Sequence, residues 1–149
     1  MKRIVLFVFP IILLIAFAFF GKTFVSGEPP LPSITVDGKP ITVFQGSYCW
    51  RGFLGGKCVD MASPPEIIKF HRVVPEKISP ESILSINFKN EPLSDSVRAN
   101  LWISDEQTEE LSINDNQLIA PKEKGVYVYD IYARWDKGDA SFVFSIEVE

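Results

Sequence analysis

An uninterrupted apolar run at residues 4–20 constrains this chain more than any other feature, because it contains no charge and no hydrogen-bonding side chain. Its 17 residues slightly exceed the apolar core of a signal peptide and lie near the lower limit for a membrane-spanning helix. Lys2 and Arg3 precede the run, and Lys22 follows it. Because positive charge is retained on the cytoplasmic side, the sequence predicts a cytoplasmic N-terminus and export of everything after about residue 22.

The apolar run has two alternative fates. It remains as a membrane anchor over residues 4–25, or it is a signal segment that is cleaved after Val25-Ser26-Gly27. Both alternatives place the rest of the chain outside the cytoplasm, in the cell membrane for an anchor and secreted for a signal. We therefore expect a cytoplasmic basic end at 1–3, the anchor or signal at 4–25, a proline-rich spacer at 26–33 and an extracytoplasmic domain at 34–149.

The charge of the exported part argues against nucleic acid as a partner. The whole chain has a net charge of −4, but residues 1–27 hold three basic residues and no acidic one. The remaining 122 residues therefore carry 12 basic and 19 acidic side chains, a net charge of −7. Phosphate binding requires clustered Lys and Arg, so we expect no nucleic-acid partner.

The only two cysteines, Cys49 and Cys58, predict a disulfide. Eight residues separate them, and three of these are glycines that allow the chain to turn. In an oxidising compartment such a pair forms a disulfide, which would stabilise the fold by about 2–3 kcal/mol in the chain-entropy model. The zinc alternative requires four ligands, and His71 is the only imidazole. We expect neither a metal nor another cofactor.

Hydrophobic alternation predicts about seven short strands and only one short helix. Strands are expected at 34–36, 41–44, 82–89, 97–103, 118–120, 126–135 and 140–148, the first two joined by a turn at 37–40. The polar residues 104–117 are expected to form a loop. Ser63-Pro64-Pro65-Glu66 is typical of a helix start, and Pro75 limits the helix to one or two turns. The pattern predicts an all-β fold, an antiparallel β-sandwich.

The segment Gly125-Val126-Tyr127-Val128-Tyr129 resembles the tyrosine motif of bacterial immunoglobulin-like and fibronectin-like surface domains. The resemblance covers residues 80–149 and implies an immunoglobulin-like sandwich, with Tyr127 or Tyr129 as its characteristic tyrosine. Its usual disulfide between the sheets is missing, because Cys49 and Cys58 are too close in sequence. The layout also resembles small envelope proteins of Gram-positive bacteria.

Motifs of catalysis are missing from the sequence. It contains no Gly-x-Ser-x-Gly, His-Glu-x-x-His or phosphate-binding Gly-Lys-Ser/Thr pattern. His71 is expected to lie on the surface or at a helix end. A group of acidic residues is expected to lie in a solvent-exposed loop. The alternative, a calcium-binding loop, would need alternating Asp or Asn residues and a Gly, which this segment lacks. The residues of the group are Asp105, Glu106, Glu109, Glu110 and Asp115. We predict no catalytic residues and no enzymatic activity.

The segment around the cysteines is the strongest candidate for binding. Large, rigid side chains on a loop closed by a disulfide offer contact area to a partner at a low entropic cost. The candidate binding residues are Tyr48, Trp50, Arg51 and Phe53. In the alternative interpretation, Tyr48 and Trp50 pack on the sandwich. Trp102, opposite Leu101 and Ile103, would contact a second partner or pack beneath the acidic loop.

The sequence thus predicts a membrane-anchored, non-catalytic binding module of the cell envelope. Its partner would be another envelope protein or a cell-wall ligand, with the membrane itself contacted through residues 4–25. The alternative is a secreted immunoglobulin-like protease inhibitor, which would need a cleaved, soluble product.

Overall fold

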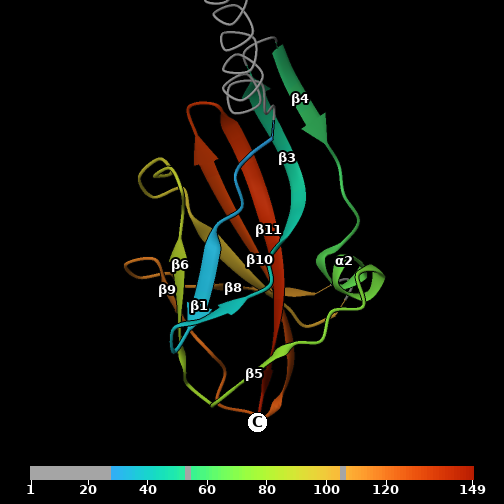
Figure 1. Cartoon of the computed structure of the whole chain (residues 1–149), viewed down its shortest axis with the longest axis vertical. Coiled ribbons are helices and arrows are strands. Elements are labelled where there is room, and N and C mark those ends of the chain that lie inside the picture. The colour runs from blue at the N-terminus through green and yellow to red at the C-terminus, as the bar shows by residue number, and fades with distance from the viewer. Residues whose placement is uncertain (1–27, 53–54, 105–106) are drawn as a thin grey trace, which may run out of the picture.

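The computed structural model describes residues 28–52, 55–104 and 107–149, which form two mostly antiparallel β-sheets and one short helix (Figure 1). Sheet A has the strand order β2 (Lys39–Ile41), β1 (Ser33–Val36), β6 (Ile83–Asn87) and β9 (Gln117–Ile119). Sheet B has the order β4 (Gly55–Val59), β3 (Phe44–Gly52), β11 (Gly138–Val148), β10 (Gly125–Trp135), β7 (Arg98–Trp102) and β8 (Thr108–Leu111). The short strand β5 (Glu76–Ile78) pairs with β11 in parallel.

The hairpin of β10 and β11 is the centre of sheet B. Its two strands pair without interruption from Gly125–Val148 to Trp135–Gly138, and a tight turn joins them. The predicted alternation is confirmed on β10, where Tyr129, Ile131 and Ala133 are completely buried. Because these side chains point toward sheet A, the sheets pack face to face.

The core between the two sheets takes side chains from both. Ile34 and Ile86 of sheet A belong to the same buried cluster as Ile131 and Phe144 of sheet B. A second cluster lies where β3 meets the β10–β11 turn and includes Trp50, Trp135 and Phe142. The prediction of an all-β, sandwich-like fold is therefore confirmed.

Helix α2 (Pro64–Phe70) begins as the sequence predicts. Pro64 occupies the first turn, and the Ser63 backbone N–H donates to the Glu66 carboxylate at 3.3 Å. This bond satisfies a backbone donor that the helix itself leaves without a partner. The helix is also as short as expected and ends at His71.

Helix α2 covers the outer face of sheet B. The alternation of apolar and polar residues along the strands would by itself predict that this face is exposed to solvent. Ile67 is only 4% exposed, and α2 lies against β11, β10 and β3. On the same outer face of β11, Val143 and Ser145 are buried as well. Strand β11 is therefore buried on both faces along its middle.

Some element predictions were wrong in detail. The described residues contain eleven strands rather than about seven. The expected loop at 104–117 contains β8, which pairs with β7 through four residue pairs. The turn expected at 37–40 is tighter, because Lys39 and Pro40 already belong to β2. The expected cysteine loop is itself a hairpin of β3 and β4.

The predicted anchor or signal segment at 4–25 lies outside the described residues. Within the ranges that the structure describes, no helix has the length and apolar character needed to cross a membrane. The first described residue, Glu28, is held by the hairpin of β3 and β4: its carboxylate accepts hydrogen bonds from Tyr48 and Lys57, both at 3.3 Å. The chain therefore enters the domain beside this hairpin.

Candidate functional site

The predicted disulfide between Cys49 and Cys58 is confirmed. The two cysteines are directly opposite one another on β3 and β4, and we call this pair of strands the cysteine hairpin. Strand β3 pairs with β11, and β4 forms the edge of sheet B. The disulfide thus cross-links an edge strand to its neighbour.

Tyr48 and Trp50 point from the cysteine hairpin into the core. They are 6% and 5% exposed, and Trp50 contacts Trp135 edge to face, with the ring centroids 5.4 Å apart. These positions favour the packing interpretation of both rings, and their role in binding stays a prediction. Arg51 lies on the opposite face and is exposed, whereas Phe53 lies outside the described residues.

A hollow of about 340 Å³ lies on the outer face of sheet B, beside the disulfide. The strand register brings its lining together, because Cys58, Cys49 and Asp139 are successive neighbours across β4, β3 and β11. Tyr132 and Ser141 form the next row, on β10 and β11. The lining residues are Ser47, Tyr48, Cys49, Cys58, Val59, Asp60, Tyr132, Asp139 and Ser141.

Sequence reasoning found the cysteines and Tyr48 but missed the rest of this lining. The missed residues include Asp60, Tyr132 and Asp139. Asp60 lies more than 70 residues before Tyr132 and Asp139 in the sequence, and the pairing of β3 with β11 brings these segments together. One signal was available: Tyr132 alternates with Ile131 and Ala133, so its ring had to lie on the outer face.

The hollow has an acidic lining. Asp60 and Asp139 contribute carboxylates, and neither Lys nor Arg is among the lining residues. Ser47 positions the first of these, since its hydroxyl donates to Asp60 Oδ1 at 3.2 Å and accepts the Met61 N–H at 2.9 Å. The site is therefore suited to a cationic or hydrogen-bond-donating group.

Tyr132 stays a neutral hydroxyl at physiological pH. Desolvation raises the pKa of Tyr132, and the charge of Asp139 raises it further, against a smaller opposite effect of Arg134. The phenol therefore offers one donor and one acceptor to a molecule in the hollow.

Asp130 lies one row further along the outer face. Burial raises its pKa to about 6, although hydrogen bonds with Asn100 and Ser141 oppose this rise. Its Oδ1 is buried and has no hydrogen-bond partner within the described residues. Because Ser141 also lines the hollow, this carboxyl is in contact with the wall of the candidate site.

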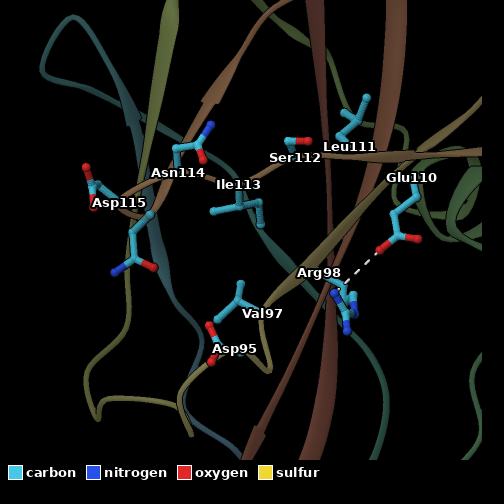
Figure 2. A pocket seen from close by; sticks show the side chains of 10 residues that line it. Asp95, Val97, Arg98, Glu110, Leu111, Ser112, Ile113, Asn114 and Asp115 are labelled. Atoms are coloured by element: carbon cyan, nitrogen blue, oxygen red, sulfur yellow. Dashed lines mark ion pairs between the residues drawn. The ribbon is translucent and has the colours of Figure 1, made fainter.

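A larger hollow of about 610 Å³ lies near the other edge of sheet B (Figure 2). Arg98 and Glu110 approach one another on one side of it, at 3.7 Å, while Asp95 and Asn114 lie apart from them. Among the described residues no group of three or more His, Cys, Asp or Glu side chains is placed to hold a metal ion. Asp105 and Glu106 of the calcium alternative lie outside those residues.

His71 lies at the end of α2 and at the surface, as the sequence predicts. Its ring is stacked on Phe44, with centroids 4.3 Å apart, and the residue is exposed. Phe70 contacts the same ring edge to face at 5.2 Å. The imidazole therefore contributes to the packing of α2 against β3.

The hollow beside the disulfide combines a rigid backbone, two carboxylates, a phenol and two serine hydroxyls. These groups can accept hydrogen bonds and attract positive charge. Comparisons with models of protein families, with curated proteins and with solved structures found no match for this chain.

Proposed function

We propose that this protein is a membrane-anchored, extracytoplasmic binding module, and that its partner contacts the hollow beside the cysteine hairpin. The observation that carries the proposal is an open acidic hollow built on a disulfide-linked pair of strands. A site on rigid strands loses little conformational entropy when a partner binds.

The disulfide supports an extracytoplasmic location. Disulfides persist in oxidising compartments and are rare in the cytosol. Cys49 and Cys58 are both in the part of the chain expected to be exported, and no free cysteine accompanies them.

The position of Glu28 supports a close approach of the cysteine hairpin to the membrane. The proposed anchor ends at residue 25, and three extended residues span at most about 10 Å. Glu28 is bound to Tyr48 and Lys57, so the hairpin would be the membrane-proximal end of the domain. Proteins anchored in the same membrane would then meet this site at a high effective concentration.

An immunoglobulin-like topology is part of the proposal. Tyr127 near the start of β10 donates its hydroxyl to the Glu123 carbonyl oxygen at 2.8 Å. A tyrosine that bonds to the backbone a few residues upstream, near the start of a late strand, is a hallmark of these sandwiches. This bond therefore supports Tyr127, rather than the buried Tyr129, as the characteristic tyrosine.

Crosslinking in intact cells tests the proposed function. The full tagged chain is compared with a variant carrying Asp60→Asn and Asp139→Asn, and with a control carrying Glu109→Gln and Glu123→Gln. The control loses the same charge at exposed positions outside the hollow. We expect wild type and control to capture the same partner and the Asp60→Asn, Asp139→Asn variant to lose it.

Two outcomes would contradict the proposal. Equal capture by all three proteins would remove the hollow from the binding surface. A shorter product in the medium, lacking residues 1–27, would contradict the anchor and favour the secreted inhibitor.

A further inference from the structure

Strand β4 is the least protected sheet edge in the described part of the chain. Other edge strands are short or charged: β2, β5 and β9 have three residues each, and Glu109 and Glu110 occupy β8. Strand β4 has five residues, and Lys57 is its only charged residue. Short strands and charged edges prevent unwanted pairing, so β4 is the edge that remains available to another strand.

The backbone of β4 presents hydrogen-bonding groups outward. The Cα atoms of Cys49 and Cys58 are 4.0 Å apart, a separation typical of antiparallel partners that do not bond to one another. The N–H and C=O groups of Cys58 and Gly56 therefore point away from β3. Arg51, opposite Gly56, agrees with this pattern, since its N–H donates to the Lys137 carbonyl oxygen on the other side of β3.

The acidic hollow lies on the outer face of this edge. Side chains alternate along β4, so Gly56 and Cys58 lie on that face, whereas Lys57 points to the other face and contacts Glu28. Asp60 follows β4 on the outer face and lines the hollow. An added strand would thus place every second side chain beside the hollow, with no side chain at Gly56 in the way.

We infer that β4 binds an extended segment of a partner protein as an additional strand, with a Lys or Arg of that segment beside Asp60 and Asp139. This inference rests on the proposed function and names the class of partner. Backbone hydrogen bonds to Gly56 and Cys58 hold the segment, and the basic side chain selects it. The disulfide keeps the edge extended before the partner arrives, which lowers the entropic cost of pairing.

Synthetic peptides test the inference on the unmodified full chain in lipid nanodiscs. The probe is a short fluorescent peptide of alternating Thr and Val with one central Lys, and its match carries Glu instead of Lys. We expect the Lys peptide to bind roughly five- to ten-fold more tightly and to slow hydrogen exchange at the Gly56 and Cys58 amides. N-methylation of alternate peptide nitrogens should abolish its binding. No binding of the Lys peptide up to about 1 mM, or equal binding of all three peptides, would overturn the inference.

The crosslinking assay separates this inference from the proposed function. Gly56→Pro removes the outward donor without removing a bond between β3 and β4. Loss of capture in Gly56→Pro, with a cooperative unfolding transition like that of wild type, supports strand addition. Capture by Gly56→Pro equal to that by wild type, with loss in the Asp60→Asn, Asp139→Asn variant, would overturn strand addition and leave the binding function intact. Crosslinks between two copies through β4 would also overturn it.

Discussion

The rings of Trp50 and Trp135 meet edge to face, 5.4 Å apart, beneath the end of sheet B that carries the disulfide on its outer face. Trp135 also donates its indole N–H to the Asn90 carbonyl oxygen at 2.9 Å. Phe88 and Phe142 complete this aromatic cluster. Trp50 therefore packs the cysteine hairpin against the core.

The burial of Trp50 predicts a large effect on stability. Trp50→Ala should lower the free energy of unfolding by about 3–5 kcal/mol, because it leaves a cavity against Trp135. Arg51→Ala, the neighbouring exposed position, should change it by less than about 0.5 kcal/mol. Urea denaturation of both variants measures the difference. Similar small effects would mean that Trp50 is not a core residue.

The long strands and the disulfide could be predicted from the sequence, because their signals are local. On β10 the alternation through Tyr129 and Ile131 extends over eleven residues, and the two cysteines are the only ones in the chain. The helix start at Ser63 is equally local.

The remaining features depend on pairing between distant segments. Strand β5 has three residues, too few to show a period, and exists because β11 continues beyond the end of β3. Strand β8 is polar because it is an edge, so its composition predicted a loop. The docking of α2 on the outer face of sheet B is equally non-local, because Ile67 is the only buried residue of the helix.

Loss of the disulfide should destabilise the protein without abolishing the fold. A cross-link with a sequence separation of 9 contributes about 2–3 kcal/mol in the chain-entropy model. The two sheets share a core that does not involve the cysteines. We therefore expect Cys49→Ser with Cys58→Ser to lower Tm while keeping a cooperative transition in calorimetry. Complete unfolding at 25 °C would contradict this prediction.

Gly138 should tolerate no side chain. Its φ is +142°, and a Cβ added there would overlap the Cys49 carbonyl oxygen. By contrast, a Cβ at Gly56 would find its nearest neighbour, the Trp50 carbonyl oxygen, at 3.8 Å. Gly138→Ala should therefore cost about 2–4 kcal/mol, and Gly56→Ala less than about 1 kcal/mol. Chemical denaturation of the two variants provides the test, and equal losses would contradict the close approach of β11 to β3.

Asp130 should make the stability of the folded domain depend on pH. Its pKa is raised from 3.8 to about 6 by burial, so the folded state retains a proton that the unfolded state releases. The stabilisation is complete below about pH 4 and is lost as the pH rises through 6. It amounts to at most about 3 kcal/mol.

Asp130→Asn isolates this contribution, because the amide stays neutral at every pH. Other carboxyl groups titrate equally in both proteins, so the difference in unfolding free energy between wild type and variant reports Asp130 alone. We expect the variant to gain stability relative to wild type between pH 4 and pH 7, with urea midpoints as the measurement. Glu123→Gln, at an exposed position, should show no such relative gain. Parallel pH profiles of wild type and Asp130→Asn would mean that the carboxyl is hydrated in solution and that burial does not govern its titration.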